Sequence, residues 1–382
     1  MKKRPNHFLA PANHGTFKKE NKIRQKEGFV MEIGISTFVE TTPDVKTGNV
    51  ISHAERLRQV VEEIVLADQV GLDVFGVGEH HRVDYAASSP AVVLAAAASR
   101  TKQIRLTSAV TVLSSADPVR VFQDFSTLDA LSNGRAEIMA GRGSFIESFP
   151  LFGYDLQDYN ELFDEKLDLL LKIRETEKVS WQGKHRPAID HLGVYPRPVQ
   201  NPLPVWVGSG GNSESVVRAG LLGLPLVLAI IGGSPVQFAP LVELYKKAAI
   251  HAGHDPEKLP VASHSHGFLA ESTEAAAELF FPSTQAAMNK IGKERGWGPY
   301  NRASFDAARH FDGALYVGDP KTVAEKIIHL RKKVGITRFM LHVPVGTMPH
   351  DLVLNAIERL GREAAPIVRE EIAKWEAAGE PK

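Results

Sequence analysis

The sequence predicts a (β/α)8 barrel, a closed cylinder of eight parallel strands surrounded by helices, formed by one domain over residues 31–382. Two observations support this prediction. From Met31 onward, eight short apolar runs alternate with longer amphipathic runs, as strands and helices alternate in such barrels. In addition, four strand-to-helix connections end in a pair that places an N-capping side chain before a proline at the first helical position. These pairs begin at Ser89, Asp117, Ser234 and Asp319.

The eight expected strands are short runs rich in Val, Ile, Leu and Phe, and most are bounded by turn-forming residues. In chain order they cover residues 32–37 (EIGIST), 73–78 (DVFGVG), 104–113 (IRLTSAVTVL), 136–141 (AEIMAG), 204–209 (PVWVGS), 225–230 (PLVLAI), 260–269 (PVASHSHGFL) and 338–343 (RFMLHV).

The expected helices show apolar residues at i, i+3, i+4 and i+7, and several end in a glycine suited to a left-handed C-cap. They include residues 53–71, 118–134, 159–177, 213–223, 235–253 and 320–335. The competing architecture is a doubly wound open sheet. That fold would be expected to carry a glycine-rich fingerprint after an early strand, and the sequence has none there.

Two segments interrupt the regular alternation. Residues 179–204 are rich in proline and aromatic residues, which indicates loops or a hairpin between the fourth barrel helix, expected at residues 159–177, and the fifth strand. Residues 281–319 are too long for a simple connection, so we expect an insertion there, before the last strand, that acts as a lid or mobile segment. We expect both segments near the mouth of the barrel.

The first thirty residues differ from the rest of the chain. Residues 1–30 are basic, have no apolar periodicity and lack the continuous apolar stretch of a secretory signal, so we expect a disordered extension. Two explanations are open. The segment is a flexible arm, or it lies outside the natural coding sequence, because the KEG before Met31 can be encoded by a purine-rich ribosome-binding sequence.

Composition excludes several classes of protein. Forty-five basic residues balance 45 acidic ones, which argues against nucleic acid or an anionic membrane as the partner and favours a small molecule. The chain has no cysteine, so disulfides, thiolate nucleophiles and cysteine-ligated zinc are excluded. No apolar run approaches the roughly twenty residues of a membrane span. We expect a soluble, cytoplasmic protein.

In a barrel of this kind the active site lies at the carboxyl ends of the strands. His80 and His81 follow the second expected strand, and a near-neutral imidazole there suits proton transfer. Since adjacent residues of an extended segment point in opposite directions, we expect only one ring to face a ligand. A structural role for the histidine is the alternative.

The fourth and fifth expected strands end in features that suit an anion. Arg142 lies between two glycines, and its guanidinium offers a planar fork of donors that matches a phosphate. The stretch GSGGNSES, residues 208–215, is a glycine-rich turn that enters a helix, whose first amides form an anion site. Together the two features suggest a phosphate, although Arg142 in a structural salt bridge is the alternative.

A metal site is a different interpretation of the barrel mouth. His264 and His266 alternate on the seventh expected strand and so share one face, as metal ligands in barrel hydrolases do. Such a site needs a carboxylate or a further histidine close by. A substrate pocket, or contact with polar neighbours, explains the pair equally well, and we expect no metal.

From about Gly76 to Gly153, the chain resembles the bacterial luciferase-like flavin monooxygenases in the order and spacing of EHH, TSAVTVL, NGRAEIMAGRG and the intervening residues. The resemblance extends more loosely through PLPVWVGSGGNSES and YVGDPKTVAEKI, so it covers nearly everything after Met31. It implies the barrel fold and reduced FMN as the cofactor, with the phosphate held after the fourth and fifth strands.

The resemblance also implies roles for individual residues. Arg142, Gly211, Asn212 and Ser215 match positions that hold the flavin phosphate, and His80 matches the acid–base catalyst of luciferases. Ala109 and Val110 match a non-prolyl cis peptide beneath the flavin ring. Two positions depart from the family pattern, because Gly141 replaces a reactive cysteine and Asn160 replaces a second phosphate-binding arginine. Light emission is therefore not expected.

The function that the resemblance implies is oxidation of a small organic substrate with reduced FMN and dioxygen, with the reduced flavin supplied by a separate reductase. A homodimer is implied as well. Two alternatives are open: deazaflavin-dependent dehydrogenation or reduction by hydride transfer, and flavin binding without catalysis. The aromatic segments near the mouth suggest a largely apolar substrate.

Overall fold

The computed structural model of the protein describes residues 31–378. The prediction of a disordered extension falls on residues 1–30, which lie outside the described residues. No helix within the described part is long and apolar enough to cross a membrane.

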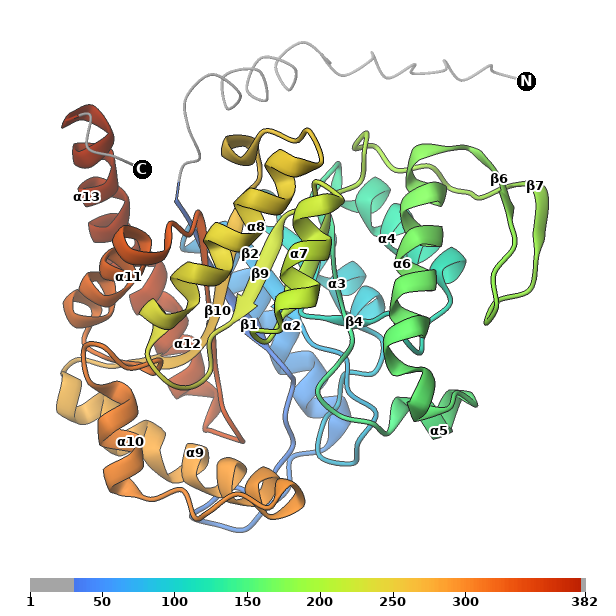
Figure 1. Cartoon of the computed structure of the whole chain (residues 1–382). Coiled ribbons are helices and arrows are strands. Elements are labelled where there is room, and N and C mark those ends of the chain that lie inside the picture. Colours follow the sequence, from blue (N-terminus) through green and yellow to red (C-terminus); the bar gives the residue numbers. More distant parts are fainter. Residues whose placement is uncertain (1–30, 379–382) are drawn as a thin grey trace, which may run out of the picture. The chain divides into compact units, whose positions relative to one another are not determined.

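Eight parallel strands close into a barrel, as predicted, and each contains or lies within one of the eight expected apolar runs (Figure 1). The cylinder closes because β1 pairs with both β2 and β12, while β10 pairs with both β9 and β12. Almost every strand residue is buried, as expected for parallel strands covered by helices. The strands are β1 (Glu32–Thr37), β2 (Val74–Val77), β3 (Arg105–Ser108), β5 (Ala136–Gly141), β8 (Val205–Ser209), β9 (Leu226–Ala229), β10 (Val261–Leu269) and β12 (Arg338–His342).

The third expected strand is interrupted. It is divided into β3 and a short strand, β4 (Thr111–Val112), which also pairs with β5. The peptide bond between the two pieces, Ala109–Val110, is cis, as the family resemblance implies.

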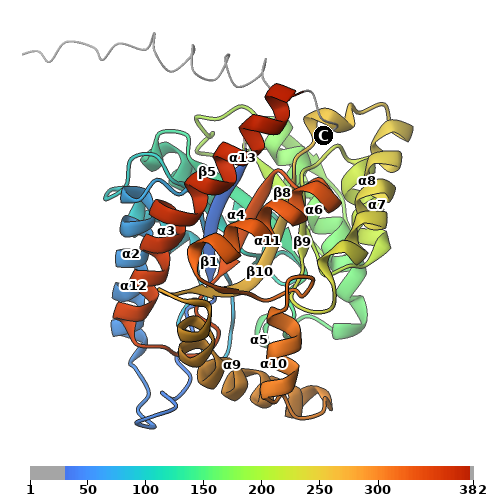
Figure 2. The same ribbon diagram turned by 90° about the vertical axis from the view of Figure 1, so that its left-hand side faces the viewer.

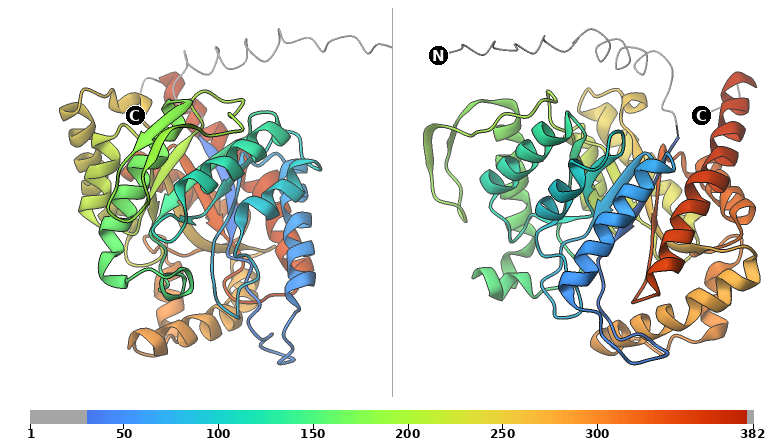
Figure 3. Two further views of the ribbon diagram at one scale, coloured as in Figure 1. Left: turned by 90° about the vertical axis from the view of Figure 1, so that its right-hand side faces the viewer. Right: turned by 180° about the vertical axis from the view of Figure 1, so that it is seen from behind.

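Helices surround the barrel on all sides (Figures 2 and 3). Asp117 and Asp319 cap their helices through side-chain oxygens, as predicted. Ser89 and Ser234 also occupy the N-cap position before a proline, as predicted, but their side chains make no cap hydrogen bond, so they do not cap as Asp117 and Asp319 do. The helices beside the barrel are α2 (His53–Gln69), α3 (Pro90–Ala98), α4 (Pro118–Ser132), α6 (Tyr159–Glu175), α7 (Ser213–Leu221), α8 (Ala239–His251), α11 (Pro320–Val334), α12 (His350–Arg359) and α13 (Ala365–Ala378).

Of the two alternatives expected for residues 179–204, loops or a hairpin, the structure has a hairpin. Its antiparallel strands are β6 (Lys178–Trp181), which begins one residue before the segment, and β7 (Ile189–Gly193). The hairpin is held to α6 by the Glu165 carboxylate, which accepts hydrogen bonds from three successive backbone amides between the strands. The segment contributes no residue to the pocket described below, so its expected place near the mouth stays a prediction.

Residues 281–319 are mostly helical. The segment begins inside α9 (Thr273–Arg295), which continues through Pro282, and it includes α10 (Arg302–Arg309) and β11 (Tyr316–Gly318). The sequence pattern hid α9 because the residues it buries include alanine, serine and threonine, which make a weak apolar stripe. Helices α9 and α10 both lie at the end of the barrel that is formed by the carboxyl ends of the strands (Figure 1).

The interior of the barrel is layered. At the amino ends of the strands, Arg338 bonds Glu137 at 2.6 Å, and each side chain is 2% exposed. A small apolar cluster that includes Met139, Trp206 and Met340 fills the middle. Polar side chains return at the carboxyl ends, where the functional site lies.

Candidate functional site

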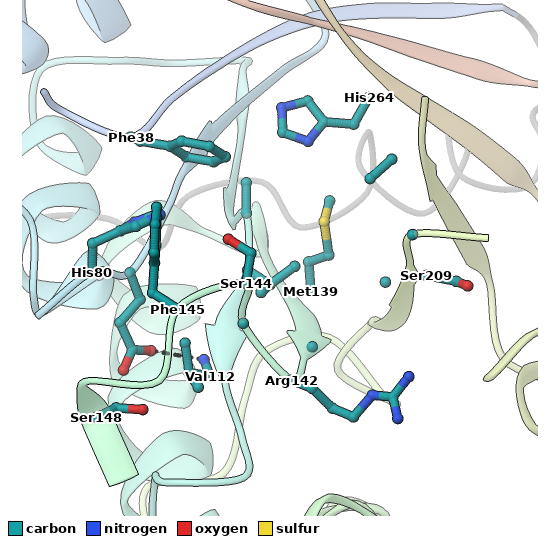
Figure 4. A pocket seen from close by; sticks show the side chains of 18 of the residues that line it. Phe38, His80, Val112, Met139, Arg142, Ser144, Phe145, Ser148, Ser209 and His264 are labelled. Atoms are coloured by element: carbon teal, nitrogen blue, oxygen red, sulfur yellow. Dashed lines mark hydrogen bonds between the residues drawn. The ribbon is translucent and has the colours of Figure 1, made fainter. Parts of the chain in front are cut away.

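A cavity of about 390 Å³ opens at the carboxyl ends of the strands, which is a size typical of small-molecule sites. Its walls come from loops and strand ends all around the barrel. Figure 4 shows Arg142 at one end and Phe38, His80 and His264 at the other, with Met139 between them. Residues that line it include Phe38, Glu79, His80, His81, Ala109, Val110, Val112, Met139, Gly141, Arg142, Ser144, Phe145, Ser148, Gly208, Ser209, Gly210, Asn212 and His264.

Arg142 follows β5 and is held by two neighbours. Its guanidinium donates to Asn160 Oδ1 and, at 3.0 Å, to Ser215 Oγ. Asn160 is one of the two residues that depart from the family pattern, and here its amide oxygen orients Arg142. Because a guanidinium carries five N–H donors and these bonds use two, donors are left for an anion in the pocket.

The turn after β8 lies beside Arg142. Gly211 adopts a φ of +106°, and its amide donates to Ser209 Oγ at 3.2 Å, which shapes the turn. Asn212 caps α7, because its Oδ1 accepts from the Ser215 amide at 3.1 Å. Of the residues expected to hold a phosphate, Arg142 and Asn212 line the pocket, whereas Gly211 and Ser215 are not among its lining residues.

The Ala109–Val110 pair projects into the same cavity. The Val110 side chain lies against two glycines: a Cβ atom added to Gly141 would come within 2.6 Å of it, and one added to Gly208 within 3.1 Å. Just beyond, the Val112 amide donates to the Glu79 carboxylate at 2.9 Å, the bond drawn in Figure 4. Glu79 thereby fixes the backbone after the cis peptide to the loop after β2.

His80 is buried among aromatic rings at the other end of the pocket. It stacks on Tyr85 at 4.4 Å between ring centroids and lies 4.6 Å from Phe38. Burial, together with the nearby His342 and His81, lowers the pKa of His80 to about 3. The expected near-neutral pKa is therefore wrong, because desolvation disfavours the imidazolium. Near pH 7 the ring is neutral.

His80 Nδ1 is buried without a hydrogen-bond partner among the described residues. His81 differs, since its Nε2 contacts Glu79 Oε1 at 2.9 Å. Both residues border the pocket, and His81 is engaged by the loop, so the expectation that only one ring faces a ligand stays a prediction.

The metal interpretation gains no support from the histidines of β10. His264 lines the pocket and bonds Ser36, while His266 lies 5.1 Å from His342, ring to ring. Within residues 31–378, the one group of three His or carboxylate side chains within metal-binding reach is Asp158, Glu161 and His185, beside the hairpin.

Sequence reasoning missed several pocket residues. Phe38 directly follows β1, and Phe145 follows the Gly-Arg-Gly turn, so position relative to strand ends was the available signal. Phe145 is flanked by two cations, because the guanidinium carbons of Arg82 and Arg295 lie 4.6 Å and 5.5 Å from its centroid. These contacts hold one aromatic wall of the site.

Comparisons with known proteins bear on this geometry. The sequence profile of the family described as "Luciferase-like monooxygenase" matches residues 31–338. The N-acetyl-S-alkylcysteine monooxygenase of Bacillus subtilis is 31% identical over 312 residues, covering 76% of this chain and 88% of that protein. The F420-dependent glucose-6-phosphate dehydrogenase of Amycolatopsis mediterranei is 31% identical over 163 residues, covering 40% of this chain and 48% of that protein.

Among solved structures, the oxygenating constituent of 3,6-diketocamphane monooxygenase from Pseudomonas putida, a type II Baeyer-Villiger monooxygenase in complex with FMN, superimposes with a TM-score of 0.71 at 21% identity. It covers 88% of this chain and 98% of its own, and at this identity it supports the fold. The chain spans about half the length of the first curated relatives that it matches. The profile match and the Bacillus relative nevertheless confirm the resemblance found in the sequence, and the chain belongs to the luciferase-like monooxygenase family.

Proposed function

We propose that this protein is a flavin-dependent monooxygenase that uses reduced FMN and dioxygen to oxidise a small, largely apolar organic compound. The observation that carries the proposal is the joint opening of Arg142, the Asn212 turn, the Ala109–Val110 pair and His80 onto one cavity. A phosphate-tailed ring system fits this donor set, with cationic and amide donors at one end and aromatic and imidazole groups at the other.

Arg142 would hold the phosphate, supported by the amides at the start of α7, where the helix dipole favours an anion. Val110 would lie against the flavin ring. Gly141 and Gly208, which have no side chains, leave room for the Val110 side chain. When bound, reduced FMN supplies the electrons that activate dioxygen. Phe38 and Phe145, which line the far end of the pocket, would exclude water there and so limit side reactions.

His80 would hold or move a proton beside the reacting atoms as a neutral imidazole. Its lowered pKa suits a ring that accepts a proton only transiently, or that donates a hydrogen bond without carrying charge. A separate reductase would supply the reduced flavin, and a homodimer would be the working form.

Hydride transfer with a deazaflavin is the second candidate, supported by the similarity to the F420-dependent dehydrogenase. Flavin binding without catalysis is a third candidate. The open cavity beside His80 favours an enzyme over this candidate, because it leaves room for a substrate. Titration with oxidised and reduced FMN and with a deazaflavin, combined with dioxygen uptake, separates the three. Tight FMN binding with dioxygen consumption is the expected result, and deazaflavin binding alone would overturn the proposal.

The first test variant is Arg142→Ala. Loss of charged hydrogen bonds to the phosphate should weaken FMN binding by about 10- to 100-fold, while riboflavin, which has no phosphate, should bind almost as before. Fluorescence titration of both ligands measures the two affinities. Arg120→Ala, on the exposed side of α4, is the matched control. Equal losses for FMN and riboflavin would remove the phosphate from this end of the pocket.

A further inference from the structure

Four polar side chains form a continuous chain from the pocket into the protein. His264, which lines the pocket, contacts Ser36 Oγ through Nε2 at 2.5 Å. Ser36 Oγ contacts His342 Nδ1 at 3.3 Å, and His342 Nε2 contacts Glu40 Oε1 at 3.4 Å. All four residues are at least nine-tenths buried, so water does not compete for these bonds.

The order of these groups permits two arrangements of hydrogens. When Glu40 is ionised, His342 donates to it from Nε2, Ser36 donates to His342 Nδ1, and His264 donates to Ser36 from Nε2. His264 Nδ1 is then a bare acceptor. When Glu40 is protonated, every hydrogen bond reverses and the hydrogen of His264 lies on Nδ1. The hydroxyl of Ser36 joins the two rings because it donates and accepts at once.

We propose that His264, Ser36, His342 and Glu40 form a proton relay that exchanges one proton between the pocket and the buried Glu40 carboxyl. Uptake of a proton at His264 Nδ1 moves one proton across each link and leaves one on Glu40, so no electrons move and charge balances. The reverse shift returns a proton to the pocket. Its use in catalysis rests on the proposed monooxygenase function, and His264 is then a further group that exchanges protons with the reacting molecules.

The surroundings of the relay are consistent with storage on the carboxyl. Burial raises the pKa of Glu40 to about 8, so both of its protonation states are accessible near neutral pH. Burial lowers the pKa of His342 to about 3 and that of His264 well below its usual range, so the rings pass protons on without holding them. The other titratable or charged groups near the relay are His80, Tyr85, His266, Arg56 and Glu63.

The relay can be tested without flavin by nitrogen NMR of the protein with labelled histidine rings, assigned with His264→Gln and His342→Gln. As the pH rises through about 8, both rings should change from the Nδ1–H to the Nε2–H form, because Glu40 loses its proton. Glu40→Gln should abolish both changes. Ser36→Ala should abolish the change at His264 and leave that at His342.

The matched control is Ser126→Ala, which removes a buried hydroxyl of α4 that makes no hydrogen bond among the described residues. Both rings should still respond in it. A His264 ring that keeps one form on both sides of pH 8, or that still changes in Ser36→Ala, would overturn the relay.

A second measurement connects the relay with turnover. Ser36→Ala and Glu40→Gln should bind FMN as the wild type does, yet turn over about tenfold more slowly or worse, since loss of acid–base help costs at least this much. Unchanged turnover with normal FMN binding would overturn the catalytic use of the relay. If the wild type fails to bind FMN, the proposed function fails, and the NMR result still decides whether the relay exists.

Discussion

His80 illustrates how burial changes the chemistry of a residue. The sequence identified it by position, but the aromatic rings around it and the lowered pKa make it a neutral group. We expect His80→Gln to lower turnover by about 100-fold, because a positioned acid–base group contributes at least this factor, with little effect on FMN affinity. Stopped-flow kinetics with reduced FMN measures both.

The pH dependence follows with a definite sign. Since the folded pKa of His80 lies near 3, below the value of a free histidine, the imidazole is deprotonated throughout the neutral range and its titration adds no step there. We therefore expect the pH profiles of turnover of the wild type and of His80→Gln to have the same shape near pH 6.5. No step near that pH should be present in the wild type and absent from the variant. Such a step would refute the neutral assignment, and the exposed His251→Gln serves as the control.

Gly141 shows why the position of the missing cysteine matters. A Cβ atom there would lie 2.6 Å from Val110, so Gly141→Ala must displace the Val110 side chain that borders the pocket. We expect a loss of about 1–3 kcal/mol in the free energy of unfolding, together with weaker FMN binding. Urea denaturation and flavin titration measure these effects. Gly298→Ala, where an added Cβ meets nothing within 4 Å, should be silent.

At the residue scale, the sequence predicted the groups that follow strands in recognisable turns, such as Arg142 and Asn212. It did not predict the relay. Ser36 and His342 are 306 positions apart and meet only because β1 and β12 close the barrel. No local pattern marks such a pair, and nothing in the sequence around Glu40 indicates that its side chain is buried.

At the element scale, α9 is tied to the loops around the pocket by charged groups. Glu294 accepts from Arg82 at 2.6 Å, Lys290 bonds Asp84 at 2.8 Å, and Arg295 donates to the Ser144 carbonyl at 2.9 Å. No residue of α9 itself lines the pocket. Closure of residues 281–319 over a bound flavin, expected from the sequence, therefore stays a prediction. In it, Arg82 acts as a latch, meaning that its ion pair with Glu294 holds α9 against the loop after β2.

Limited proteolysis tests this latch. Arg82→Gln should speed cleavage within residues 281–319 and reduce the protection that FMN gives, because Arg82 also bonds Glu147 beside the pocket. Arg302→Gln is the matched control, since Arg302 bonds acids of α9 and α10 only. Cleavage in the wild type that flavin does not change would exclude closure by this segment.

The elements themselves were predictable to different degrees. The barrel strands could be recognised in the sequence, because parallel strands that are buried on both faces appear as continuous apolar runs. The division of the third strand came from the family resemblance, not from its residues, which form one uninterrupted run. The sequence pattern did not indicate helix α9, because the helix is buried largely through small and polar side chains.

At the scale of the whole molecule, the buried charges at the amino ends of the strands join distant parts of the barrel. Arg338 on β12 bonds Glu32 on β1 and Glu137 on β5. Arg338→Met should lower the free energy of unfolding by about 3–5 kcal/mol, because it leaves Glu137 buried with less compensation. Urea denaturation measures the loss.

The double variant Arg338→Met with Glu137→Met is the informative control. It removes both charges, and Arg105 and Glu32, 3.3 Å apart, still pair with each other, so most of the stability should return. Losses that simply add would show that the two side chains contribute independently.

The sequence also anticipated the architecture, since eight strand–helix repeats leave few alternatives to a closed barrel. It could not establish what the barrel associates with. The homodimer and the reductase rest on the family resemblance and stay predictions, because composition and periodicity carry no information about either partner. Sedimentation of the purified protein measures the first directly.

The unequal ends of the pocket have a consequence for how a ligand enters. Arg142 is the single arginine or lysine among the lining residues in the described part of the chain, while the imidazoles of His80 and His264 opposite it are uncharged at neutral pH. A molecule with an anionic tail and a flat, uncharged head therefore has one favoured direction of insertion. Turned the other way round, it would bring its charge into an aromatic, water-poor corner.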